Sequence, residues 1–339
     1  IIRDFEALGH WVLFDLWDDE AAPSVSPALI VADVRSPRSD TLQRMQKCLA
    51  LFRRKSLPLL WLLHNSSPRA RIQGSALQAE HILQYDRLGL VLPGVIERLT
   101  DDEKKATANA MACEARDFLI SMFTDTSALT PAQVDVGTAI VTKAIAETNI
   151  GDWLQVVWSF DNVTHQHCLL VAGLAAAFAR SLGMSERDSR HLTKAALLHD
   201  IGKVAVPVAI LNKPSFLTKD EMLVMRTHAA HGHAMLQGRG FEAEMLQVVR
   251  SHHEMLDGSG YPDGLAGSQI PDVVRLVTIC DIYAALIERR PYKAPMSMVR
   301  AYEILKEMSG RLDPDLVRAF EPIAQAFTPI GKNGHAQPA

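Results

Sequence analysis

The sequence has few cysteines, and they lie far apart. Four occur among 339 residues, and no two of them form a Cys-x-x-Cys pair. Disulfide frameworks and zinc ribbons both need cysteines at short, repeated spacings, so the sequence predicts neither. We expect four reduced thiols that serve as small apolar residues, at Cys48, Cys113, Cys168 and Cys280.

Long apolar runs and an excess of positive charge are also missing. No uninterrupted apolar run approaches the roughly 20 residues that a membrane-spanning helix needs, and the first residues lack the pattern of a signal peptide. The net charge of −4 gives no electrostatic attraction for a nucleic-acid polymer, and the basic run Arg53-Arg54-Lys55 is typical of a solvated helix face. We therefore expect a cytoplasmic protein with no membrane span and no DNA or RNA partner.

The length and the changing texture of the chain predict two domains. At 339 residues the chain exceeds the size at which one hydrophobic core usually stops growing. Compact apolar runs at residues 11–15, 28–33 and 57–63 predict a small α/β domain with a parallel sheet, whereas the sequence after residue 97 shows only helical periods. We divide the chain into an α/β domain, a helical linker, an all-α domain and a flexible tail, at residues 1–97, 98–127, 128–327 and 328–339.

Capping patterns predict where several helices begin. Thr100-Asp-Asp-Glu103 is a capping box that would open the linker helix near residue 101. A second capping box, Thr218-Lys-Asp-Glu221, would open the helix that carries His228. We expect Asp161 and Thr164 to cap the helix that follows them rather than to touch a substrate.

Histidine is concentrated in the helical half, where nine of the 13 His lie between His165 and His253. A metal site built from separate helices needs imidazole and carboxylate ligands that converge on one point, with a position left open for water or substrate. Nitrogen and oxygen ligands without thiolate favour iron, manganese or another first-row divalent ion. Five segments could supply such ligands: His167, His199-Asp200, His228, His252-His253 and Asp281.

The adjacency of His199 and Asp200 limits how they could bind metal. Successive side chains on a helix diverge by about 100°, so the two cannot chelate one ion as a flat pair. The dipeptide suits two ions instead, with Asp200 as the bridging ligand.

Several separate motifs follow one another along the helical half. They are Asp161-x-x-Thr164-x-x-His167, Ala195-Ala-Leu-Leu-His199-Asp-Ile-Gly-Lys203, Asn212-Lys-Pro214, Met225-Arg-Thr-His228 with Gly232, His252-His-Glu254, Asp257-Gly-Ser-Gly-Tyr-Pro262, Ile270-Pro271, Asp281-Ile-Tyr, Arg290-Pro-Tyr-Lys293 and Asp313-Pro314. With them, residues 128 to 326 strongly resemble the HD-GYP domain, a branch of the HD superfamily of metal phosphohydrolases that degrades cyclic di-GMP.

The resemblance implies a set of metal ligands and a mechanism. One ion would be held by His167, His199, Asp200 and Asp281, and the second by His228, His252 and His253, with Asp200 shared. A hydroxide bridging the two ions would attack the phosphodiester in line, because two close metal ions lower the pKa of bound water and clamp the attacking and leaving oxygens. The expected cofactors are two divalent metal ions, with iron or manganese favoured.

The resemblance also implies substrate contacts. Lys203 would place a positive charge over the scissile phosphate, and Arg290 and Lys293 resemble the phosphate-binding pair of the family. Tyr261 would shape the mouth of the pocket together with the glycine turn that precedes it. For Lys213, a substrate contact and a structural role in the turn before Pro214 weigh equally.

Two positions depart from the family pattern. Members with three metals carry a glutamate four residues before the first ligand histidine, and this chain has Val163 there, so we expect two metals. Three residues after Asp281 the family commonly has an aspartate, and this chain has Ala284, which removes a secondary carboxylate.

Some neighbouring side chains leave alternatives open. His165, His231 and His233 lie beside the proposed ligands, but the motif registers favour His167 and His228, and His191 is interpreted as a helix-surface residue. Glu254 and Asp257 would either orient ligand imidazoles or cap the loop that contains them.

The first domain resembles, more weakly, a response-regulator receiver domain. Asp33 ends an apolar strand where the phosphoacceptor of a receiver would lie, but the chain lacks the acidic pair, and Gln84-Tyr85-Asp86 stands where a lysine is expected. Without these groups we expect no phosphotransfer. We expect this domain and the linker helix to dock a protein partner or a second copy of the chain.

We therefore predict a bacterial phosphodiesterase that hydrolyses cyclic di-GMP to pGpG, and either pGpG or GMP is the final product. Two alternatives stay open: a non-catalytic sensor of cyclic di-GMP, and an HD phosphohydrolase acting on another cyclic dinucleotide.

Overall fold

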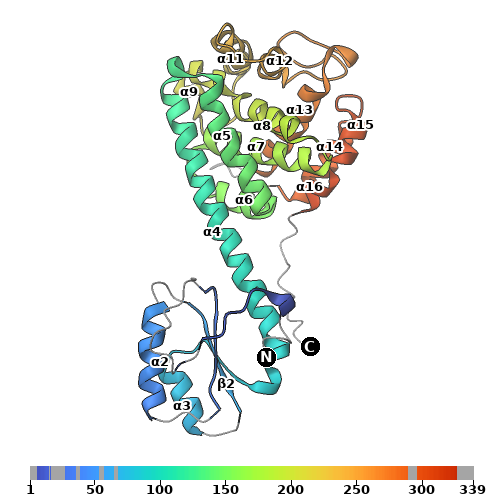
Figure 1. Cartoon of the computed structure of the whole chain (residues 1–339). Helices are drawn as coiled ribbons and strands as arrows, with labels where there is room; N and C mark the ends of the chain where they lie inside the picture. Colours follow the sequence, from blue (N-terminus) through green and yellow to red (C-terminus); the bar gives the residue numbers. More distant parts are fainter. Residues whose placement is uncertain are drawn as a thin grey trace. The chain divides into compact units, whose positions relative to one another are not determined.

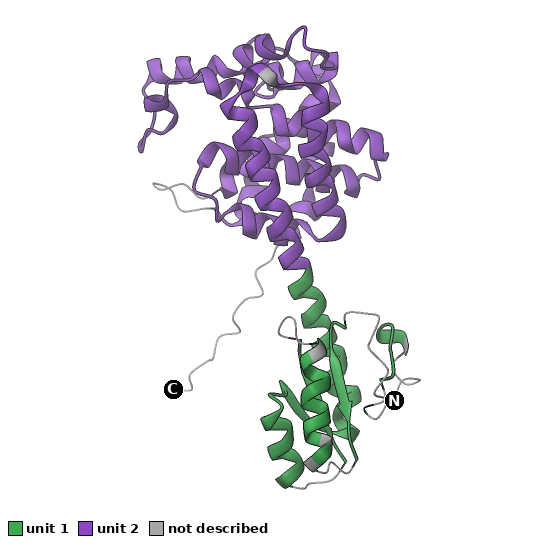
Figure 2. Cartoon of the chain, turned by 60° about the vertical axis from the view of Figure 1, so that its left-hand side comes forward, with its two compact units in different colours: residues 1–103 green, residues 104–339 purple. Residues whose placement is uncertain are grey.

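The computed structural model describes residues 6–14, 16, 27–35, 39–52, 57–64, 68–288 and 296–326, with the side chains of residues 41, 51 and 128 excepted. The chain forms two compact units, residues 1–103 and residues 104–339, shown in different colours in Figure 2. The predicted tail at 328–339, the basic run at 53–55 and the residues Arg290 and Lys293 lie outside the described residues.

Unit 1 is built on a three-stranded parallel sheet in the order β1-β2-β3. Every residue of the central strand is buried, because its alternate side chains pack against both faces. Leu59, Trp61 and Leu63 pack with one cluster, whereas Leu60 and Leu62 pack with another. The strands and helices of this unit are β1 (Ile30–Asp33), α2 (Ser39–Phe52), β2 (Leu59–Leu63), α3 (Pro68–Ala76), β3 (His81–Gln84) and the first part of α4 (Leu88–Thr124) (Figure 1).

The parallel sheet and two of the three predicted apolar strands are confirmed, but the third is wrong. Residues 11–14 are described and form no strand. The third strand of the sheet is instead β3. Its four residues are all half-buried and contain no apolar run from which a strand could be predicted. A three-stranded sheet makes unit 1 only loosely receiver-like.

Helix α4 begins at Leu88, so the start predicted near residue 101 is wrong. Leu88, Leu92 and Val95 repeat at three to four residues and pack against Leu60 and Leu62 of the sheet, which holds the earlier turns in helical form. Thr100 lies inside the helix, where its hydroxyl donates to the Ile96 carbonyl at 3.0 Å instead of capping an end.

Unit 2 is all-helical within its described residues, which confirms the predicted class of this half. Its most buried helix is α7, which packs against α5, α6, α8 and α13. The α-helices after α4 are α5 (Pro131–Glu147), α6 (Ile150–Val157), α7 (Val163–Ser181), α8 (Glu186–Leu198), α9 (Val208–Leu211), α10 (Lys219–Arg226), α11 (His228–Leu236), α12 (Ala243–Ser251), α13 (Asp272–Ile287), α14 (Met298–Glu307), α15 (Pro314–Ala319) and α16 (Glu321–Gln325).

The helix caps near the motifs of the helical half differ in part from expectation. Helix α7 is capped by Asn162, whose side chain accepts from the His165 N–H, and not by Asp161 or Thr164. The capping box of Thr218 and Glu221 is present, but the helix it opens ends at Arg226. His228 begins the next helix, α11, because the chain turns at the intervening threonine.

No helix in the described part of the chain combines the length and the apolar character that crossing a membrane requires. All four cysteines are free, as expected; Cys168 and Cys280 are buried, whereas Cys48 and Cys113 are half-buried.

Candidate metal centre

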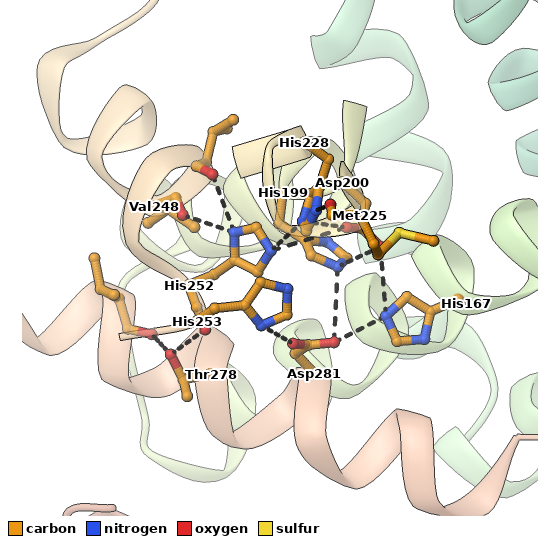
Figure 3. A network of polar contacts seen from close by, with 12 residues as sticks. His167, His199, Asp200, Met225, His228, Val248, His252, His253, Thr278 and Asp281 are labelled. Atoms are coloured by element: carbon orange, nitrogen blue, oxygen red, sulfur yellow. Dashed lines mark hydrogen bonds and ion pairs between the residues drawn. The ribbon is translucent and has the colours of Figure 1, made fainter. Parts of the chain in front are cut away.

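Five segments of unit 2 deliver seven side chains to one place (Figure 3). Three of the segments are helix ends. His199 caps the end of α8 and Asp200 opens the short 3-10 helix η4 (Ile201–Ala205); His228 begins α11; and His252 follows the last residue of α12. The other two segments are helix interiors, with His167 in α7 and Asp281 in α13.

Gly202 explains how two of these segments come so close. A Cβ at this position would lie 1.9 Å from the carbonyl oxygen of His228 and 2.5 Å from the backbone nitrogen of Gly232. Only glycine therefore lets η4 pack directly on α11. This contact brings the dipeptide His199-Asp200 beside the imidazole of His228.

The seven side chains form two groups of possible metal ligands. Asp200, His228, His252 and His253 make up the first group, and His167, His199 and Asp281 the second. Within each group, one ligand atom from every residue lies within 4.8 Å of the others. The division corresponds to the two ions that the family resemblance implied.

Asp200 lies between the two groups and presents a different oxygen to each. Its Oδ1 is 3.2 Å from Nε2 of His228 and 3.8 Å from Nε2 of His252. Its Oδ2 is 3.2 Å from Nε2 of His199 and 3.6 Å from Nε2 of His167. A carboxylate in this position has the geometry of a ligand shared by two ions.

Asp281 makes a second, longer connection between the groups. Its Oδ1 lies 2.8 Å from Nε2 of His167 and 3.9 Å from Nε2 of His199, while its Oδ2 lies 3.5 Å from Nδ1 of His253. The family resemblance implied that Asp281 binds only the ion held by His167 and His199. In the structure it contacts both sets of imidazoles.

The donor atoms fit a cationic occupant. His199 Nε2 and Asp200 Oδ1 are buried and have no hydrogen-bond partner among the described residues, although other ligand nitrogens lie close by. Buried lone pairs that face one another are costly unless a cation neutralises them. Because the set contains imidazole and carboxylate but no thiolate, it suits first-row divalent ions such as iron or manganese.

Burial and neighbouring charges set the protonation of the site. Burial lowers the pKa of His253 to about 3, and burial together with the adjacent imidazoles lowers that of His252 well below its usual range. Burial alone would raise the pKa of Asp200, but Lys203 and His199 hold it well below its usual range. At neutral pH these two imidazoles are therefore neutral and the carboxylate is ionised, the states that metal ligands require.

Lys203 lies one turn after Asp200 and pairs with it directly, with Nζ 2.5 Å from Oδ2. Burial by itself would lower the pKa of this lysine, but the Asp200 carboxylate raises it. The ammonium group is therefore a fixed positive charge at the edge of the ligand cluster.

Tyr261 covers the imidazole of His253. The two rings stack with centroids 4.6 Å apart, and the guanidinium of Arg226 lies 4.8 Å above the tyrosine ring. Arg226 belongs to the motif that ends at His228, but no role was predicted for it. Gly260 permits this arrangement, because a Cβ there would lie 2.4 Å from the Cα of Glu254.

Glu254 and Asp257 hold the loop and do not orient imidazoles. The Glu254 carboxylate accepts from the backbone N–H groups of Asp263, Gly264 and Leu265 at 2.7 to 3.1 Å. Asp257 accepts from the backbone and the hydroxyl of Ser259. Of the two roles that the sequence left open, the structure therefore favours loop capping.

The remaining candidates lie apart from the cluster. Lys213 pairs with Glu221 at 2.5 Å, which supports its structural role. Among the described residues, His165, His231 and His233 belong to neither ligand group. His191 pairs with Glu242 and Glu244, as a histidine near the surface would.

Glu288 was missed by the sequence reasoning. It is 2% exposed, and its Oε2 lies 3.1 Å from Nδ1 of His167, on the opposite side of the ring from Asp281. Burial would lower the pKa of His167, but Glu288 and Asp281 raise it to about 10. A signal did exist, because Glu288 follows Asp281 by seven residues, two turns of helix.

Comparison with protein families gives a match to the HD domain over residues 151–316. A Pseudomonas aeruginosa protein named a cyclic di-GMP phosphodiesterase is 35% identical over 239 residues, which are 69% of this chain and 58% of that protein. A Vibrio cholerae protein named a 3'3'-cGAMP-specific phosphodiesterase is 38% identical over 159 residues, 47% of this chain and 35% of that protein. The chain thus spans a little more than half the length of the first relative and about a third of the second.

Among solved structures, an HDG"Y"P protein from Bdellovibrio bacteriovorus resembles this chain with a TM-score of 0.54. The match covers 71% of this chain and 81% of that chain at 16% sequence identity. At this identity the likeness supports the fold and not the activity.

Proposed function

We propose that this chain is a metal-dependent phosphodiesterase that hydrolyses cyclic di-GMP. Residues 151–316 match the HD domain, and the relatives named cyclic di-GMP phosphodiesterases support the predicted HD-GYP relationship. The expected products are the linear dinucleotide pGpG and then GMP. The proposed cofactors are two divalent ions, with iron or manganese favoured.

The position of Asp200 carries this proposal. Its two oxygens face different sets of imidazoles, so one carboxylate can serve two ions. When bound, two such ions would activate water as the nucleophile and neutralise charge on a phosphodiester. The seven proposed ligands are His167, His199, Asp200, His228, His252, His253 and Asp281.

The other side chains of the site have proposed roles in holding substrate. Lys203 supplies a positive charge that can stabilise a phosphate as its own charge develops during the reaction. Tyr261, stacked between His253 and Arg226, forms one wall of the entrance. Arg290 and Lys293 are proposed phosphate contacts on the basis of their sequence motif alone.

A second candidate is hydrolysis of another cyclic dinucleotide. The relative named as 3'3'-cGAMP-specific favours it, because its identity to this chain is as high as that of the cyclic di-GMP relative. The non-catalytic sensor is the weaker alternative, since a binding module has no need for two groups of metal ligands that share a carboxylate.

For unit 1 and helix α4 we propose a regulatory role, as a docking site for a protein partner or a second copy of the chain. Strand β3 ends at Gln84 and is followed by Tyr85, so the lysine of a working receiver is replaced. We also propose residues 98–127 as the connection between the domains, and the bacterial cytoplasm as the compartment.

The test is a turnover assay of the full chain after anaerobic reconstitution with Fe²⁺ or Mn²⁺. Cyclic di-GMP and 3'3'-cGAMP are incubated with protein in parallel, and the products are resolved by chromatography. We expect pGpG from cyclic di-GMP, with GMP appearing later. Faster cleavage of cGAMP would favour the second candidate, and binding without turnover under every metal condition would favour the sensor.

Metal analysis of the same samples tests the number of ions. We expect two per chain, because Val163 opens α7 at the position where a third ion would need a carboxylate. His191→Ala is the matched control, since it removes a histidine outside both ligand groups and should leave metal content and turnover unchanged. Three tightly bound ions per chain would contradict the expectation.

A further inference from the structure

We infer that Glu288 is a positioning residue that fixes the tautomer and the orientation of His167, an inference that rests on the proposed metal site. Each imidazole that presents Nε2 to an ion needs a partner for Nδ1, because that partner decides which nitrogen carries the proton and how the ring is turned. The structure supplies this partner in two different ways.

Three of the imidazoles use backbone carbonyls in the last turn of the helix that precedes them along the chain. Nδ1 of His199 lies 2.6 Å from the Ala196 oxygen, and Nδ1 of His228 lies 2.7 Å from the Met225 oxygen. Nδ1 of His252 lies 3.2 and 3.1 Å from the two oxygens of Val248 and Val249. Figure 3 shows part of this pattern.

These carbonyls are available because the helices end there. The last four carbonyls of a helix have no intrahelical partner. Ala196 is in the last turn of α8, Met225 in that of α10, and Val248 and Val249 in that of α12. A histidine placed at such an end finds its Nδ1 acceptor without any contribution from a side chain.

His167 has no such acceptor, because it is the fifth residue of a 19-residue helix. The carbonyls of the turn before it accept the regular hydrogen bonds of α7. An acceptor for its Nδ1 must therefore come from the side chain of another element. Glu288 supplies it at 3.1 Å, from the residue that directly follows α13.

The surroundings leave Glu288 well suited to this role. The side chain is buried, so its orientation is restricted, and its backbone N–H donates to the Ala284 carbonyl at 2.8 Å. Ala284, one turn earlier on α13, is itself buried, and its methyl side chain carries no hydrogen-bond acceptor.

The test compares Glu288→Ala and Glu288→Gln with the full-length wild type. Metal affinity is measured without substrate, by competition with a chelator, and the Co²⁺-loaded proteins are compared by visible absorption. We expect Glu288→Ala to weaken binding of one of the two ions by about 10- to 100-fold and to shift the spectrum. Glu288→Gln keeps an oxygen that can accept from Nδ1 and should stay within about fivefold of wild type.

Glu307→Ala is the matched control, because it removes one carboxylate from the same unit at an exposed ion pair with Arg300. It should leave both ions unchanged. Wild-type affinity in Glu288→Ala would overturn the inference, and so would equal losses in the two Glu288 variants, since charge and not the hydrogen bond would then matter. Because the readout is metal affinity, a wild type that binds two ions without turnover would refute only the proposed function.

Discussion

Each unit of this chain has an aspartate paired with a histidine, and only one of these pairs belongs to a ligand cluster. In unit 1, Asp33 ends β1 and pairs with His64, which follows β2 and stacks on Tyr85. The side chain of Asp33 is 30% exposed. In unit 2, Asp200 is 1% exposed and faces four imidazoles and a lysine.

The difference shows that convergence, and not the dipeptide itself, makes a possible metal site. Asp33 meets one histidine brought by the neighbouring strand, because parallel strands place their carboxyl ends at one edge. Asp200 meets side chains from several helices, and their close approach depends on Gly202. A short motif therefore has chemical meaning only with the elements that pack around it.

The same substitution in both units should give the largest contrast. Asp200→Asn removes the shared carboxylate, so we expect the loss of bound metal and a fall in turnover of about a thousandfold or more. Asp33→Asn should change turnover less than twofold. Metal analysis and the cyclic di-GMP assay measure both, and activity surviving in Asp200→Asn would show that the site is misplaced.

Lys203 pairs with Asp200, and among the described ion pairs no lysine pairs with Asp33. Replacing Lys203 should give the second largest effect on turnover. Lys203→Met takes away a positive charge near the reacting phosphate, so we expect turnover to fall by about a hundredfold. Both metal ions should stay bound, because the lysine donates no ligand. Simultaneous loss of metal would instead make the lysine a structural support of Asp200.

Acid should destabilise the metal-free protein through the buried imidazoles. The pKa of His253 is lowered to about 3 and that of His252 is also lowered well below its usual value of 6.5, so the unfolded chain binds more protons below pH 6.5 and stability is lost as the pH falls. From pH 7 to pH 5 we expect His253 to contribute a loss of about 2 kcal/mol, and His252 to add to that loss. His167 opposes this in part, since its raised pKa gives stability that is greatest below pH 6.5.

Urea unfolding at pH 7, 6 and 5 measures this loss directly. His253→Gln should remove one histidine's share of the dependence while the rest remains. A stability that does not change between pH 7 and pH 5 would mean that these imidazoles are not buried in the neutral form.

The smallest effect is expected from a phosphoryl donor. Asp33 is already paired with His64, and no lysine stands where a receiver would place one after β3, so acetyl phosphate should add no mass to the chain. His64→Ala frees the carboxylate but restores none of the missing groups, and should also stay unmodified. Intact-mass measurement checks both proteins, and a gain of one phosphoryl group would show that unit 1 is a working receiver.

The sequence was sufficient where a pattern is local and repeated. The apolar runs at 28–33 and 57–63 predicted strands β1 and β2, and the spaced motifs predicted which side chains would meet. It was insufficient where tertiary packing decides. Strand β3 has no apolar run, and α4 starts early because its first turns pack on the sheet. Glu288 follows α13 and contacts His167 of α7, a contact between segments far apart in the sequence.

Prediction from the sequence also erred at helix boundaries. Asp161 and Asn162 both stand directly before α7 and Thr164 lies in its first turn, and only the geometry of that turn selects Asn162 as the cap. Likewise, a turn at Thr227 separates the capping box of Glu221 from His228. A sequence pattern does not locate a helix boundary to within one residue, yet a shift of one residue changes which backbone N–H and carbonyl groups lie at the helix end.

That sensitivity has a consequence for the histidines that use backbone carbonyls at the ends of α8, α10 and α12. No side-chain substitution can remove these acceptors, so an alanine scan would pass over them. Inserting or deleting one residue in the last turn of α8 or α12 would rotate the following histidine by about 100° and remove its acceptor. In these helices, a change of length should therefore disturb the site more than most side-chain substitutions along them.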